Sequence, residues 1–219
     1  MFSRLLLFSC ITLPLISAVD DKCFPRDLTS ITASKTWKHT GDKGHGPQFA
    51  STLEEGINKQ INFELSAHYT YLSLSYHFDS YKIYMPGFSK FFKKMAEEEH
   101  EHAQMFMKYQ NKRGGKIRLN SIPAPCHDGS WGNGTHAMKR ALHLEKTIYD
   151  MLLKLHKLQD AQESDPQFQD FIESNFLGEQ VDSIKQLANY VHILQRLDSS
   201  LGEYEFDKWT LGGGKDSIS

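Results

Sequence analysis

Four long stretches of the chain repeat apolar residues at steps of three and four, and this pattern limits the possible folds more than any other feature. The stretches cover about 52–78, 86–113 and 135–159, and a fourth begins at Pro166 and continues past Leu194. Each has roughly 25 to 29 residues, which gives a helix of about 40 Å at 1.5 Å per residue. No strand-like alternation competes with this pattern, so the chain is predicted to be all-α.

The apolar stripe of each stretch predicts which side of the helix faces the core. In the first stretch the stripe passes through Ile57, Ile61, Leu65, His68 and Leu72. In the fourth it passes through Phe168, Phe171, Ile172, Phe176, Ile184, Leu187, Val191 and Leu194.

The lengths of the connections predict the topology. Short links join the first stretch to the second and the third to the fourth, so the helices of each pair should be antiparallel. The link between the second and third stretches, residues 116–134, is long enough to cross the length of a bundle. The sequence therefore predicts a four-helix bundle with one long crossover, followed by a short fifth helix over about 201–209.

The N-terminal residues carry the signs of secretion. Arg4, an apolar run and the small residues Ser17 and Ala18 form the pattern of a secretory signal peptide over residues 1–18. The mature chain is then predicted to have an N-terminal extension at 19–46, the bundle at 47–211 and a flexible tail at 212–219. The expected location is extracellular.

Secretion bears on three further residues. Cys23 and Cys126 would remain after cleavage, and an oxidising compartment permits them to form a disulfide, within one chain or between subunits. Asn133 begins an Asn-Gly-Thr sequon and is a candidate glycosylation site. The net charge of -2 argues against nucleic acid as a partner, and the apolar run of the signal peptide is too short to span a membrane comfortably.

Polar side chains interrupt the apolar stripes and point to one interior. They are Glu64 and Tyr71 in the first stretch, Glu99 and His102 in the second, Glu145 in the third and Gln180 in the fourth. Burying an unpaired carboxylate costs several kcal/mol, so three of them in one core need a shared cation. Carboxylate oxygens with one imidazole suit iron or manganese better than zinc or softer metals.

Each of these residues has a simpler interpretation when it is taken alone. A buried glutamate is more often a salt-bridge partner, and Glu97-Glu98-Glu99 is a charge run of the kind that usually faces solvent. The Glu-x-x-His spacing of Glu99 and His102 also arises by chance in helices rich in these residues. The agreement of all four helices is what favours a metal site.

Several motifs resemble those of heavy-chain-type ferritins, over about residues 48–211. The motifs are Asn58-Lys59-Gln60-Ile61-Asn62-Phe63-Glu64-Leu65, Glu98-Glu99-His100-Glu101-His102-Ala103, Arg113-Gly114-Gly115, Ala141-Leu142-His143-Leu144-Glu145-Lys146, Asp170-Phe171-Ile172-Glu173 and Phe206-Asp207-Lys208. The resemblance implies a ferritin-like bundle with a carboxylate-rich iron site between its helices.

In that family two Fe(II) ions are oxidised by dioxygen, and ferric mineral grows inside a shell of 24 subunits, of one chain type or two. The resemblance places the first iron on Glu64, Glu99 and His102, with Glu99 bridging to a second iron completed by Glu145. Gln180 would sit over the second iron, and Tyr71 would form a hydrogen bond nearby and take part in the oxidation. The fourth helix has no second Glu-x-x-His, so the second iron should be held more weakly.

The resemblance also assigns an iron entry pore. Asp170 and Glu173, with His156 nearby, would line this pore where three subunits meet. Acidic residues at the start of a helix also stabilise the helix dipole, which is the simpler explanation for the first two.

Two glutamates beside the metal ligands, Glu98 and Glu101, would face the shell cavity and help to nucleate mineral. The last helix departs from the family, because Glu205 and Trp209 stand where an apolar residue and a histidine are usual. The pore that this helix forms in other members is therefore not expected to be the same here.

The function predicted from the sequence is a secreted iron-storage protein with its own ferroxidase activity. The alternative is a carrier or structural subunit that depends on a partner chain for oxidation, which a missing ligand would have favoured. A di-iron enzyme acting on an organic substrate would need a second Glu-x-x-His and a substrate pocket. A helical interaction protein without metal is disfavoured by the buried carboxylates.

Overall fold

The computed structural model describes residues 50–125, 131–158 and 165–212, and within these ranges every regular element is helical. The long helices are α2 (Ser51–Asp79), α3 (Pro86–Lys112), α4 (Gly134–His156) and α6 (Gly178–Leu197). The shorter ones are α5 (Pro166–Ile172), η2 (Glu173–Leu177), α7 (Ser200–Glu205) and η3 (Phe206–Thr210). The predicted all-α fold is confirmed.

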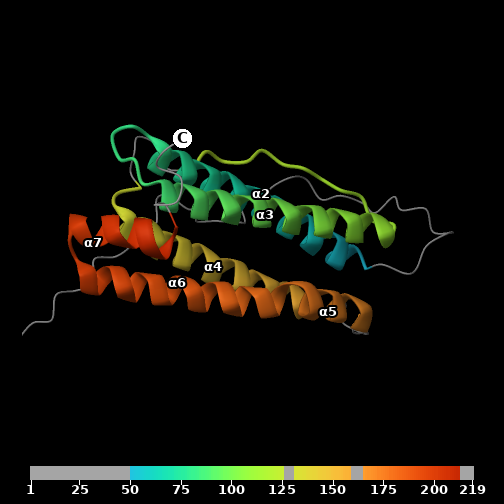
Figure 1. Cartoon of the computed structure of the whole chain (residues 1–219). Helices are drawn as coiled ribbons and strands as arrows, with labels where there is room; N and C mark the ends of the chain where they lie inside the picture. The colour runs from blue at the N-terminus through green and yellow to red at the C-terminus, as the bar shows by residue number, and fades with distance from the viewer. Residues whose placement is uncertain (1–49, 126–130, 159–164, 213–219) are drawn as a thin grey trace, which may run out of the picture.

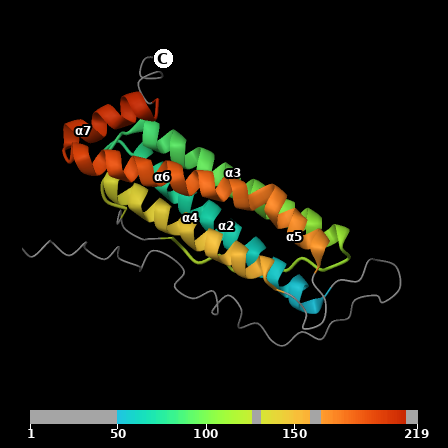
Figure 2. The same ribbon diagram turned by 90° about the horizontal axis from the view of Figure 1, so that it is seen from below.

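The helices form two antiparallel pairs that pack on each other. Helix α2 lies against α3, α4 lies against α6, and α2 contacts α4 across the centre (Figure 1). Figure 2 shows the connection from α3 to α4 running along the bundle, and α7 turning across its end. None of the described helices is long and apolar enough to cross a membrane.

The fourth helix differs from its prediction. Helix α5 passes into α6 through the π-helical turn η2, so an extra residue is accommodated at Glu173–Leu177. A repeat of apolar residues at steps of three and four does not reveal such a turn. The third helix also ends at His156, before the predicted end at Gln159, which lies outside the described residues.

The predicted core stripes are displaced in two helices. Leu65, His68 and Leu72 are only partly buried, whereas the fully buried positions of α2 continue from Ile61 through Glu64, Ala67, Tyr71, Leu74 and Phe78. In the fourth helix, Ile184 is likewise only partly buried. Because 3.6 residues complete a turn, the two consecutive steps of four from Ile57 to Leu65 carry the predicted stripe off the buried face.

Side-chain amides of α2 hold the first part of the crossover. Asn58 donates to the carbonyl of Lys116 at 2.9 Å and accepts from the backbone N–H of Arg118 at 2.8 Å. Asn62 repeats this pattern one turn later, with Arg118 at 2.8 Å and Asn120 at 2.7 Å. The extended segment is thus paired along the helix as a strand is paired in a sheet, which satisfies its backbone groups.

The ends of the helices are fixed by specific caps. Gly114, at φ +78°, follows the end of α3, and Gly115 donates to the carbonyl of Gln110 at 2.9 Å. At the other end of α3, the Phe88 N–H donates to the buried carboxylate of Asp207 at 2.8 Å. The last helix therefore supports the bundle by placing an acidic group at the start of α3.

Candidate metal centre

The polar residues predicted on four helices meet inside the bundle. Helix α2 supplies Glu64 and Tyr71, α3 supplies Glu99 and His102, α4 supplies Glu145, and α6 supplies Gln180. All six side chains are buried. The structure therefore brings all six predicted site residues into the interior.

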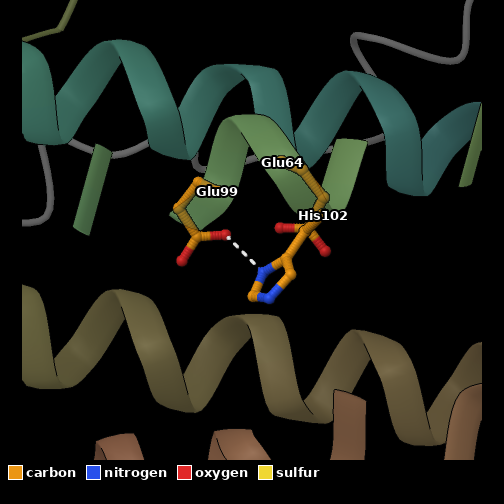
Figure 3. Close-up of side chains that lie close together, drawn as sticks. All are labelled: Glu64, Glu99 and His102. Atoms are coloured by element: carbon orange, nitrogen blue, oxygen red, sulfur yellow. Dashed lines mark hydrogen bonds and ion pairs between the residues drawn. The ribbon is translucent and has the colours of Figure 1, made fainter. Parts of the chain in front are cut away.

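Three of these residues form a group that could hold a metal ion. Glu64, Glu99 and His102 each offer one ligand atom, and these atoms lie within 4.8 Å of one another. Figure 3 shows the three side chains pointing from α2 and α3 toward α4. No other group of three His, Cys, Asp or Glu residues with this spacing occurs in the described ranges.

One oxygen of this group has no hydrogen-bond partner among the described residues. Gln60 donates to one oxygen of Glu64 at 2.7 Å, but the other oxygen, Oε2, is buried without a hydrogen bond. His102 Nδ1 lies 3.5 Å from Glu99 Oε2, a weak contact. A buried acceptor without a donor is costly, and a cation bound here would remove that cost.

The remaining residues form a second group beside the first. Tyr71 donates its hydroxyl proton to one oxygen of Glu145, and the Gln180 amide nitrogen donates to the other. The same Gln180 nitrogen also lies 3.1 Å from the backbone carbonyl of Glu145. These hydrogen bonds hold Glu145 in one orientation beside the group formed by Glu64, Glu99 and His102.

The acidity of these groups reflects their burial. Loss of solvent raises the pKa of Glu64 well above its usual range, and the charge of Glu99 raises it further. Burial and the charge of Glu145 do the same to the pKa of Glu99. The pKa of Glu145 is also raised by burial, although hydrogen bonds from Tyr71 and Gln180 oppose the change. The surrounding side chains do not offset the cost of burying the negative charge of these carboxylates. A metal ion would therefore compete with protons for them.

Known proteins are similar to this chain in sequence. A family model described as a ferritin-like domain matches residues 54–197. Soma ferritin of Lymnaea stagnalis is 54% identical over 158 residues, which cover 72% of this chain and 90% of the relative. The chain belongs to the ferritin family.

Two further relatives have similar coverage. The ferritin heavy chain of Echinococcus granulosus is 47% identical to this ferritin over 167 residues, covering 76% of this chain and 95% of the relative. The ferritin middle subunit of Salmo salar is 45% identical over 163 residues, which cover 73% of this chain and 92% of the relative. As a member of this family, the protein is an iron-storage protein.

Three residues around the site of this ferritin were not predicted to belong to it. Gln60 lies one turn before Glu64, and that spacing could have revealed it. Glu179 places Oε2 3.4 Å from His102 Nε2, and its position next to Gln180 was a usable signal. The ring of Phe176 packs edge-on against the imidazole of His102, with the two ring centroids 5.4 Å apart. Only the tertiary structure shows that last contact, because the π-helical turn sets where Phe176 points.

The predicted pore residues lie at the surface of the subunit. His156 Nε2 is 2.7 Å from Glu173 Oε1, which joins the end of α4 to η2. Asp170 is exposed and accepts from Ser174 at 3.3 Å. Within one chain, His156 and Glu173 lie together and Asp170 does not join them. The pore between subunits stays a prediction.

The predicted nucleation residues lie one turn apart on α3 and have different surroundings. Glu98 pairs with Lys94 at 2.7 Å and lines a surface cavity of about 250 Å³ between α3 and α6, together with Glu179 and Asp182. Glu101 is exposed and does not line this cavity.

The predicted modification sites are only partly described. Asn133 is exposed, and its side-chain oxygen accepts from the His136 N–H at 3.0 Å as the N-cap of α4. Cys23, Cys126 and the signal peptide lie outside the described residues. Glycosylation and disulfide formation remain predictions.

Proposed function

We propose that this ferritin is a secreted ferroxidase, which oxidises Fe(II) with dioxygen at the site between its helices and stores ferric mineral in a shell of 24 subunits. The observation that carries the proposal is the group of buried carboxylates that no lysine or arginine of the described ranges neutralises. Glu64, Glu99 and Glu145 form no ion pair with any lysine or arginine of the described residues.

The arrangement supports two adjacent iron positions. Glu64, Glu99 and His102 would bind the first Fe(II), since their ligand atoms already converge. Glu99 would bridge to a second Fe(II) held by Glu145, with Gln180 beside it. Dioxygen would take one electron from each iron, so that both ions leave as Fe(III) and the oxygen is reduced by two electrons.

The protein groups would then manage protons and charge. Carboxyl groups with a raised pKa hold protons when no metal is bound and release them as Fe(II) enters. The hydrogen bond from Tyr71 fixes the Glu145 carboxylate, which leaves less reorganisation for iron binding. The single histidine of the site and the lack of a Glu-x-x-His in the fourth helix suit a site that passes its product on to the mineral.

The alternative is a carrier or shell subunit that depends on a partner chain for oxidation. It would be favoured by a missing or displaced ligand. All six predicted residues are buried, three of them bring their ligand atoms together, and the other three are hydrogen-bonded to one another, which supports an active ferroxidase site.

The test is aerobic oxidation of Fe(II) by the purified assembled protein, followed by absorbance. A Glu64→Ala, His102→Ala double variant should lose the fast phase, whereas the exposed His192→Gln variant should keep the parent rate. Matched assembly is checked by sedimentation. Equal slow rates in parent and double variant would contradict the proposal and favour the carrier.

Secretion is tested separately, with the full chain expressed in eukaryotic cells. The medium should contain a protein that begins at Val19, because Ser17 and Ala18 form the predicted cleavage site. Treatment with an N-glycosidase should lower its mass only if Asn133 is glycosylated. Retention of the full-length chain in the cells would contradict the signal peptide.

A further inference from the structure

Two histidines lie side by side on the bundle, outside the site described above. His68 projects from α2 and His100 from α3, and their ring centroids are 5.2 Å apart with an interplanar angle of 46°. His68 is half-buried, and His100 is exposed. Neither belongs to the group formed by Glu64, Glu99 and His102.

The hydrogen bond of His68 fixes which nitrogen is available. His68 Nδ1 lies 2.7 Å from the carbonyl oxygen of Ala96, and a carbonyl can only accept. Nδ1 therefore carries the proton, and in the neutral ring Nε2 keeps its lone pair. No described residue forms a hydrogen bond with that Nε2. Histidines that bind metals commonly have their other nitrogen held in this way by a backbone carbonyl.

The separation of the rings suits one shared metal ion. With a metal–nitrogen distance of about 2.1 Å, the metal lies about 3.2 Å from each ring centroid. Two centroids 5.2 Å apart then subtend an angle of about 109° at the metal, which is the tetrahedral angle. The hydrogen bond to Ala96 keeps the His68 ring in place, so the exposed His100 ring would turn about its side-chain torsions to direct a nitrogen at the ion bound by His68.

We propose that His68 and His100 bind one late divalent transition metal, Cu(II) or Zn(II), which bridges α2 and α3. Imidazole nitrogens favour these ions, whereas the carboxylate-rich interior site favours iron. Two protein ligands leave the other positions to water. The proposal does not depend on ferroxidase activity, because it uses neither the residues nor the chemistry of that site.

Copper binding to the assembled full-length protein tests the proposal. Cu(II) is titrated into metal-free protein and followed by electron paramagnetic resonance and by spin-echo modulation, which distinguishes one bound imidazole from two. The parent should show a component with two bound imidazoles. The His100→Gln variant should lose that component and one copper per chain, whereas His192→Gln, another exposed histidine, should keep both.

The Glu64→Ala, His102→Ala variant separates this proposal from the proposed function. It should lose iron oxidation but keep the copper component with two imidazoles. Zn(II) should also raise the melting temperature of the parent more than that of His100→Gln, because the ion joins two helices. The proposal is overturned if parent and His100→Gln bind equal copper with the same spectrum, which would mean that the rings only pack together.

Discussion

At the scale of single residues, the proposed ligand Glu64 is oriented by a neighbour outside the group of Glu64, Glu99 and His102. Gln60 donates to one oxygen of Glu64 and so directs the other toward Glu99 and His102. We expect Gln60→Ala to slow Fe(II) oxidation about 10-fold or more, as is typical when a residue that orients a ligand is lost. Initial rates of the assembled protein measure this. The exposed Gln186→Ala variant is the control, and equal rates in all three would show that Glu64 is oriented without Gln60.

The buried carboxyl groups also predict how the metal-free protein responds to pH. Burial raises the pKa of Glu64 in the folded state, so the folded protein holds a proton that the unfolded chain releases. Stability should therefore fall as pH rises from the ordinary carboxyl range toward the raised pKa. Glu64→Gln removes this titration, so the variant should melt above the parent at pH 8, with the difference shrinking toward pH 5. Melting of chelator-treated protein tests this, and a constant difference would contradict it.

At the scale of elements, the start of α3 and the last helix approach too closely for any residue but glycine. A Cβ at Gly87 would lie 2.3 Å from the backbone oxygen of Asp207. We expect Gly87→Ala to destabilise the protein by about 1–3 kcal/mol, because one of the two helices must shift. Gly178→Ala is the matched control, since a Cβ there meets no atom within 4 Å. If both variants melt at the parent temperature, the contact is looser than described.

The crossover depends on asparagines that sit on the buried side of α2. Asn62 bonds the carbonyl of Arg118 and the N–H of Asn120, and it is 2% exposed. Asn62→Ala should cost about 1–3 kcal/mol, because backbone groups of the crossover lose their partners. Hydrogen exchange should accelerate at Asn120, while the exposed Asn189→Ala variant leaves it unchanged. Unaltered protection in Asn62→Ala would show that the segment is held by other contacts.

At the scale of the whole molecule, the subunit exposes aromatic surface that suits assembly. Tyr69 and Tyr76 lie on the same outer face of α2, two turns apart, and are 44% and 63% exposed. Large exposed apolar groups of this kind commonly mark protein interfaces. Tyr76→Glu should therefore shift the protein from a shell to smaller species in sedimentation. Lys146→Glu, which changes an exposed side chain of α4, should not. A full shell in both would place Tyr76 outside the subunit contacts.

The amino-acid sequence by itself determined the helices, their topology and the six residues of the candidate site. It could do so because helical periodicity is local: whether Glu64, Glu99, Glu145 and Gln180 fall on an apolar stripe depends only on their neighbours along the chain. The long link after α3 likewise requires a crossover, because its length alone lets it run from one end of the bundle to the other. The family resemblance added the role of each residue, which periodicity does not provide.

The tertiary structure decided what depends on contacts between distant segments. The pairing of Tyr71 with Glu145, the approach of Glu179 to His102 and the support of α3 by Asp207 join residues far apart in sequence. The π-helical turn and the displaced stripe of α2 are further cases, since packing against other helices selects which face is buried. Local periodicity defines a helix and its apolar side, but it does not give the rotation of that helix in the bundle.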